Sequence, residues 1–226
     1  MFKFIKKHKI KLRLFIKSGA GFTTTELLVV IAIIIFLLIV VVSNFAQIRL
    51  QFSLSRVVYK FDQDLRKAQN LALSASEYQG TEVVAGYGVK IDLNNLGRKK
   101  YNIYADKITN LANCNSNKTN CSGVNSCSGN EENDTLDYLV DTIDFSQTEP
   151  GIIIKEIIFL YGGGGIVAGV TNASINFNSC DLLLRTTITS SEAGPPNSAE
   201  IVFALESDLT NTRTVLVNKA GLIKVK

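Results

Sequence analysis

The feature that most constrains this chain is an apolar run of sixteen residues, Leu27–Val42, which contains no polar side chain. Glu26 stands directly before it, so that a single carboxylate marks the beginning of the run. A helix over residues 22–45 has 24 residues and a length of about 36 Å, which is enough to cross a bilayer. Because an ionisable group at the end of such a segment is costly in lipid, Glu26 is a candidate functional residue.

Residues 1–21 contain seven lysines and arginines and no acid. A secretory signal peptide needs an apolar core of about 7–15 residues and then a small-residue cleavage site, and no Ala-x-Ala follows this run. An ordinary signal anchor accounts for the basic flank, because positive charge stays on the cytoplasmic side. It does not account for Glu26 or for the Gly21-Phe22 junction.

The basic segment followed by Gly21-Phe22-Thr23-Thr24-Thr25-Glu26 resembles the prepilin leader of type IV pilins and type II secretion pseudopilins. The resemblance implies that a prepilin peptidase removes residues 1–21 and that Phe22 becomes an N-methylated amino terminus. It also implies that Glu26 pairs with the terminal amine of a neighbouring subunit, since a carboxylate in an apolar bundle must be neutralised or paired. The alternative role for Glu26 is an acid at a helix start, worth about 0.3–1 kcal/mol.

Apolar residues continue past the membrane segment at helical spacing, which predicts one helix over 22–79 with a transmembrane half, 22–45, and an amphipathic half. Neither glycine nor proline interrupts it, and Gly80 is the expected stop. We expect Asp62 and Asp64 to be solvated on its surface. The predicted core stripe is Leu50, Leu54, Val58, Phe61, Leu65, Ala68 and Ala72.

After Gly80 the apolar period changes to two, which predicts antiparallel strands and an α+β fold with the helix packed on a sheet. The predicted strands are Val83–Ile91, Lys100–Ala105, Ile152–Leu160, Ala173–Phe177, Leu182–Thr189, Glu200–Glu206, Arg213–Asn218 and Leu222–Val225. The last two form a hairpin, and Gly162–Gly165 form a hairpin tip rather than a phosphate loop, because no Lys-Ser/Thr pair follows.

Three segments resemble the GspH/FimT type of minor pseudopilin: the helix 64–72, the first strand with Gly86-Tyr87-Gly88-Val89, and the terminal hairpin. The resemblance implies a pilin-like fold in which residues 80–226 form the β-rich domain. An insertion at 110–149 departs from the family pattern. Three of the four cysteines lie in it, and we expect disulfides among Cys114, Cys121, Cys127 and Cys180.

Disulfides are expected because a translocated domain is exposed to oxidising conditions. The spacings of the cysteines do not match the short pairs of zinc ribbons, and four cysteines allow three pairings. The single histidine, His8, lies in the leader, so the mature chain has no histidine for a triad or a zinc site. Without residues 1–21 the chain has 17 Lys and Arg against 20 Asp and Glu, a net charge of −3.

The resemblance implies a structural subunit at or near the tip of a type II secretion pseudopilus or type IV pilus, and not an enzyme. It would be a single-pass protein of the bacterial inner membrane, with residues 80–226 in the periplasm or outside the cell. Its expected partners are the prepilin peptidase, other pilins or pseudopilins, and secreted cargo or DNA, with no cofactor and no small-molecule substrate. Two alternatives stay open: a major pilin of the shaft, and a DNA-binding minor pilin that uses Arg213, Lys219, Lys224 and Lys226.

Overall fold

A computed structural model describes residues 22–74, 77–79, 84–107, 137–180, 183–189 and 195–226, without the side chains of residues 43, 44, 46, 179, 180 and 183–185. The chain divides into two compact units, Met1–Ala46 and Gln47–Lys226. One long helix, α1 (Thr24–Leu73), runs through the division, and all the strands belong to the second unit. The α+β prediction is confirmed at this level.

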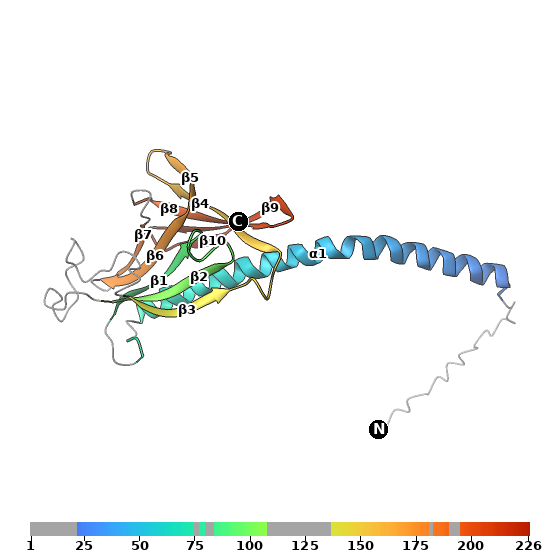
Figure 1. Cartoon of the computed structure of the whole chain (residues 1–226), viewed down its shortest axis with the longest axis horizontal. Coiled ribbons are helices and arrows are strands. Elements are labelled where there is room, and N and C mark those ends of the chain that lie inside the picture. The colour runs from blue at the N-terminus through green and yellow to red at the C-terminus, as the bar shows by residue number, and fades with distance from the viewer. Residues whose placement is uncertain (1–21, 75–76, 80–83, 108–136, 181–182, 190–194) are drawn as a thin grey trace, which may run out of the picture. The chain divides into compact units, whose positions relative to one another are not determined.

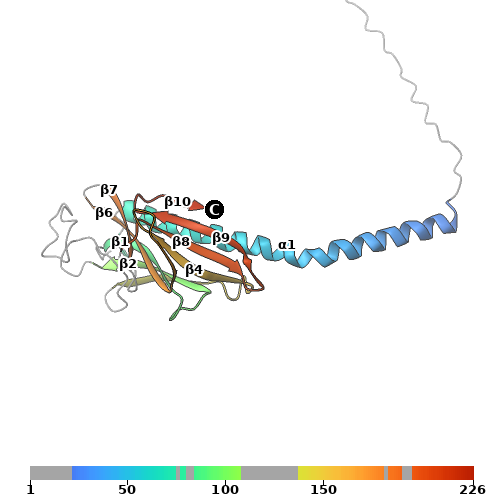
Figure 2. The ribbon, with the colours of Figure 1, turned by 90° about the horizontal axis from the view of Figure 1, so that it is seen from above.

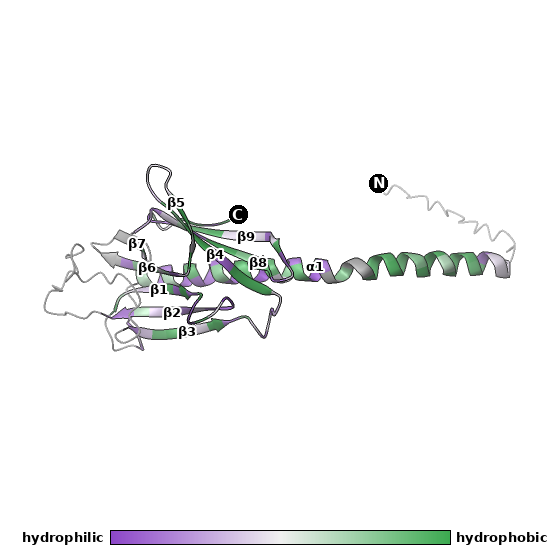
Figure 3. Cartoon of the chain, turned by 45° about the horizontal axis from the view of Figure 1, so that its top comes forward, coloured by the Kyte–Doolittle hydropathy of each residue, from purple (hydrophilic) through white to green (hydrophobic). Residues whose placement is uncertain are grey.

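In the first unit, α1 is apolar on every side. The large apolar side chains of Leu27–Val42 are between 46% and 69% exposed, and Figure 3 shows this part of α1 as an unbroken hydrophobic stretch. Among the described residues, α1 is the one helix long and apolar enough to cross a membrane. None of the other described residues covers this part of α1, so its apolar side chains are exposed on every face.

The second unit contains two five-stranded antiparallel sheets (Figures 1 and 2). The first sheet has the order β3-β2-β1-β6-β7 and the second has the order β10-β9-β8-β4-β5. The strands of the first sheet are β1 (Val84–Asp92), β2 (Lys100–Lys107), β3 (Tyr138–Asp144), β6 (Asn172–Cys180) and β7 (Leu183–Thr189). Those of the second are β4 (Ile152–Leu160), β5 (Ile166–Val170), β8 (Ser198–Leu205), β9 (Asp208–Asn218) and β10 (Ile223–Val225).

A single apolar core joins α1 to both sheets. The predicted helix stripe is confirmed, because Leu54, Val58, Phe61, Leu65, Ala68 and Ala72 are all at most 2% exposed and Leu50 is partly buried. Phe61 is central: its ring lies 4.9 Å from that of Tyr101 on β2 and 5.3 Å from that of Phe203 on β8. Aromatic pairs at these distances stabilise a core beyond their buried area.

Hydrogen bonds also tie α1 to the terminal hairpin. Arg66 Nη2 donates to the Ile223 carbonyl at 3.1 Å, and Gln69 Nε2 donates to the Gly221 carbonyl at 2.9 Å. The predicted hairpin itself is confirmed, with Ile223 opposite Val217 and Val225 opposite Val215. These bonds place β10 beside the last turns of the helix.

The predicted end of the helix is wrong, because α1 stops at Leu73 rather than near residue 79. The Ser74 hydroxyl bonds back to the Leu71 carbonyl at 3.0 Å. Tyr78 has left the helix and stacks on Tyr138 of β3, with 4.7 Å between ring centroids. A long-range aromatic contact therefore competes with helical continuation, even though neither glycine nor proline intervenes.

The other strand predictions agree with the structure to within three residues at each end, and β4 agrees at both ends, but β9 begins at Asp208, five residues before the predicted Arg213. Two strands, β3 and β5, were not predicted. β3 lies inside the 110–149 insertion and pairs with β2, so the end of this segment is an integral part of the sheet. Gly162–Gly165 form the turn between β4 and β5, as predicted, and Gly163 and Gly164 have φ angles of 83° and 86°.

Candidate functional site

Glu26 and Thr23 cap the start of α1 reciprocally. The Thr23 backbone N–H and its hydroxyl both donate to Glu26 Oε2 at 3.1 Å. In return, the Glu26 backbone N–H donates to Thr23 Oγ1 at 3.3 Å. This is a capping box, in which two otherwise unsatisfied backbone N–H groups at a helix start obtain side-chain acceptors. The sequence Thr23-Thr24-Thr25-Glu26 has the spacing that this motif requires.

The capping box uses one oxygen of the carboxylate. Every described hydrogen bond to the Glu26 side chain goes to Oε2, so Oε1 remains available to another donor. Phe22, immediately before the box, has a side chain that is 83% exposed. Gly21 and the basic residues before it lie outside the described residues. The predicted sites Phe22 and Glu26 are thus brought together at the exposed start of an apolar helix.

The predicted disulfides cannot be placed. Cys114, Cys121 and Cys127 lie outside the described residues, and of Cys180 only the backbone, at the end of β6, is described. Among the described residues, no three His, Cys, Asp or Glu side chains are grouped in a way that could hold a metal ion.

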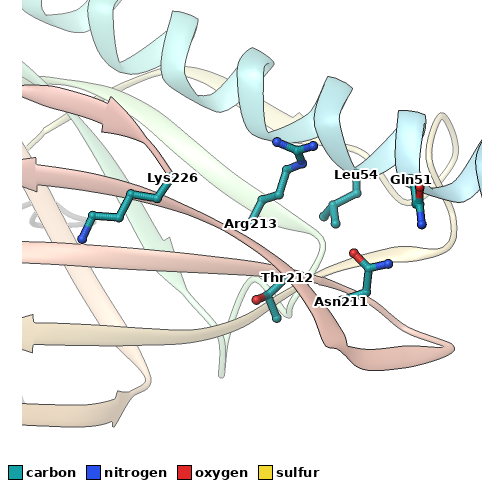
Figure 4. Close-up of a pocket in the computed structure, with 6 residues that line it drawn as sticks. All are labelled: Gln51, Leu54, Asn211, Thr212, Arg213 and Lys226. Carbon is teal, nitrogen blue, oxygen red and sulfur yellow. The ribbon is translucent and has the colours of Figure 1, made fainter.

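Two of the basic residues near the end of the chain, Arg213 and Lys226, line one cavity of about 360 Å³ between α1 and the second sheet. Arg213 points toward α1 in Figure 4, where Gln51 and Asn211 also line this cavity. Lys226 leads away from Arg213 in the same view, and its Nζ lies 2.6 Å from Glu200 Oε1. Because its charge is paired with an acid, Lys226 adds little to an anion-binding surface.

A buried acid on α1 contradicts the sequence analysis. Asp64 is 3% exposed, and its two carboxylate oxygens accept from Lys60 Nζ at 2.6 Å and from the Tyr101 hydroxyl at 2.7 Å. Burial, and then the bond to Asp64, raise the pKa of Tyr101. Asp62 is also not freely solvated, because Arg66 binds both of its oxygens.

The sequence does contain an indication that Asp64 is buried. It lies three residues after Phe61 and four before Ala68, on the same helical stripe as the core residues. A polar residue on such a stripe must find partners inside the fold, because a buried charge without a partner is costly. Lys60, one turn earlier, and Tyr101 on β2 are those partners.

A cleft of about 550 Å³ lies beside this buried group. Its apolar lining includes Val57 on α1 and Ile143 and Phe145 at the end of β3. At its rim, Arg56 Nη1 and Glu149 Oε1 are 2.6 Å apart. The Arg56 and Lys60 charges are each matched by a carboxylate, so the cleft offers no unpaired charge from these two residues for chemistry on a substrate.

Comparisons with family models, with curated proteins and with solved structures found no match to this chain. The site must therefore be interpreted from its own geometry: a carboxylate whose described hydrogen bonds all go to one oxygen, at the head of an exposed apolar helix.

Proposed function

We propose that this chain is a minor pilin or pseudopilin, a structural subunit of a type II secretion pseudopilus or type IV pilus, placed at or near the filament tip. The observation that carries the proposal is Glu26, which has no described hydrogen bond to Oε1 and stands directly before the exposed apolar part of α1. The folded sheets of the second unit would meet other subunits or cargo outside the inner membrane. The chain would act by assembly, without a cofactor.

The physical chemistry of α1 supports this role. Leu27–Val42 would lie in the bilayer of the precursor and then among the helices of other subunits in the filament. Both surroundings are apolar, so the helix could pass from one to the other at little cost. The Glu26 carboxylate would need a cation in either place, because a buried unpaired charge is strongly destabilising. The amine created at Phe22 by cleavage after Gly21 would be that cation, on a neighbouring subunit.

The processing step is tested by co-expression of the full chain with a prepilin peptidase. We expect an intact mass and an amino-terminal sequence that begin at Phe22, with about 14 Da added by one methyl group. An uncut chain would make the protein a plain membrane anchor. Cleavage beyond Val42 would make it a secreted soluble domain, and either result would contradict the proposal.

The role of Glu26 is tested with variants that remove either the charge of the carboxylate or the hydrogen bonds of the helix cap. Glu26→Gln keeps an oxygen that can accept from Thr23 but removes the charge, whereas Glu26→Ala removes both. Thr23→Ala keeps the charge and removes the hydroxyl of the cap. If the carboxylate pairs with an amine, both Glu26 variants remain in the membrane but fail to enter filaments, and Thr23→Ala assembles.

The readout is the amount of each variant in sheared filaments relative to the membrane fraction. Assembly of Glu26→Gln at the wild-type level, with loss of assembly in Thr23→Ala, would show that capping alone matters. The assigned charge pair would then be wrong.

A further inference from the structure

β5 is an exposed apolar strand at the edge of the second sheet. It pairs with β4 alone among the described strands. The side chains of Ile166 and Val167 are 66% and 42% exposed, whereas Val170 is buried. Figure 1 shows the β4–β5 hairpin projecting from the rest of the sheet. A strand with these properties is a template for pairing with another strand.

The other strands at the described sheet edges carry charged residues. β3 contains Asp141 and Asp144, β7 contains Arg185, and β10 contains Lys224 and is only three residues long. Charged residues and short length are the usual means by which proteins prevent unwanted pairing at an edge. β5, with the sequence Ile-Val-Ala-Gly-Val, has neither a charge nor a proline.

The hydrogen-bond pattern identifies which groups of β5 are open. In the turn, the Tyr161 N–H donates to the Gly165 carbonyl at 2.8 Å. Because bonded and non-bonded pairs alternate in an antiparallel ladder, Val167, which lies opposite Phe159, directs its N–H and C=O toward β4. Ile166 and Ala168 therefore direct their N–H and C=O groups away from β4, to the side on which β5 has no neighbour among the described strands.

Gly169 ends this open stretch. Ile157 lies opposite Val170 and Ile158 lies opposite Ala168, so Gly169 is an extra residue on β5, with a φ of 76°. A bulge of this kind interrupts the ladder and bends the strand. The pairing-competent edge is thus the short segment centred on Val167.

We propose that β5 pairs with β5 of a second copy of this chain, antiparallel and symmetric about Val167. Ile166 then lies opposite Ala168 of the partner subunit, and the two such pairs exchange about four hydrogen bonds. Val167 lies opposite the partner's Val167, where side chains approach most closely. In a symmetric pair each residue lies near the same residue of the partner subunit, so any charged residue would face a like charge. β5 contains no charged residue, and this repulsion does not arise.

The contact is small. A pairing of such short strand segments buries much less than the roughly 1,200 Å² of a stable interface. Two chains anchored in one membrane have a high effective concentration, which compensates for a weak contact. We therefore expect the pair in membranes and not in dilute detergent solution. The inference rests on β5 and on the membrane anchor proposed above, but not on the filament role, because a two-fold contact closes on itself rather than extending a fibre.

Cysteine crosslinking of the full chain in membranes tests the pairing. Val167→Cys places two sulfurs opposite each other at a separation that a disulfide can span. Leu209→Cys is the matched control, because Leu209 is 49% exposed on β9, and the wild type, with its own four cysteines, gives the background. After oxidation we expect about ten-fold more homodimer from Val167→Cys than from Leu209→Cys. Equal yields, or adducts with a different protein, would overturn the proposal.

Charge variants at the same position provide an independent measurement that does not depend on thiol chemistry. Val167→Lys and Val167→Glu each place like charges opposite each other, and each should lower chemical crosslinking of tagged copies by about five-fold. Co-expression of Val167→Lys with Val167→Glu should restore it. Failure of the mixed pair to exceed either single variant would overturn the assignment, because only direct opposition of the two residues predicts rescue.

Discussion

The Tyr101 hydroxyl on β2 donates a hydrogen bond of 2.7 Å to Asp64 Oδ2 on α1. The two residues are at most 3% exposed, and the Tyr101 ring also packs edge-on against Phe61. One tyrosine thus joins the helix to the first sheet by both a polar and an apolar contact. Lys60 satisfies the other oxygen of Asp64, so the carboxylate is fully partnered within the fold.

Tyr101→Phe should lower the free energy of unfolding by about 1–3 kcal/mol, because it leaves a buried carboxylate oxygen without a donor. Tyr59→Phe is the matched control: Tyr59 is 53% exposed on the same helix, and the same change there should stay within about 0.5 kcal/mol. Urea unfolding of the full chain in detergent measures both. Equal losses from the two variants would mean that the bond to Asp64 contributes nothing.

Gly86 on β1 should not tolerate a side chain. A Cβ at this position would overlap the backbone carbonyl oxygen of Phe177 on the neighbouring strand, which cannot move without breaking the β1–β6 ladder. We expect Gly86→Ala to destabilise the protein by about 1–3 kcal/mol or more. In Gly165→Ala the nearest atom would be Tyr161 Cβ at an ordinary 3.5 Å.

The Gly165 variant should therefore be neutral, or slightly stabilising because it restricts the unfolded chain. Thermal unfolding of the two variants beside wild type gives the comparison. A Gly86→Ala protein as stable as Gly165→Ala would show that the two strands can separate to admit a methyl group.

Most of this fold could be predicted from the sequence because the signals for the helix and for most strands lie within short stretches of the chain. The helical spacing of Leu54 to Ala72 and the period-two strands after Gly80 depend only on which faces are buried. The end of α1 depends instead on Tyr78 stacking against Tyr138, sixty residues later in the chain. No local pattern contains that contact.

The predictions for β3, β5 and Asp64 failed for different reasons. β3 has the sequence Tyr-Leu-Val-Asp-Thr-Ile-Asp and lies at an edge, where half-exposed side chains weaken the alternation that identifies strands. β5 is nearly all exposed and includes a glycine. Asp64 was assigned to solvent because of its charge, although its position on the core stripe indicated burial. At the helix start, the spacing of Thr23 and Glu26 fits a cap, but only the three-dimensional structure shows that the described hydrogen bonds go to Oε2.

Asp106 should make stability depend on pH. It is 3% exposed at the end of β2, and burial, together with the nearby charge of Asp137, raises its pKa from 3.8 to about 7, although a hydrogen bond from Asn176 opposes the shift. Between about pH 4 and pH 7 the folded chain then holds a proton that the unfolded chain has released. Stability consequently falls as the pH rises through this window and levels off above it.

Asp106→Asn removes this titration and keeps an oxygen for Asn176. We expect the variant to match wild type near pH 4 and to be more stable above pH 7, by on the order of a few kcal/mol. Asp208→Asn is the control. Hydrogen bonds from Thr210 lower the pKa of Asp208, so its stabilisation is lost only as the pH falls below about 4, and its removal should not change the slope above pH 5. Urea midpoints measured from pH 4 to pH 8 decide the matter: parallel curves for Asp106→Asn and wild type would show that Asp106 is ionised in the folded protein throughout.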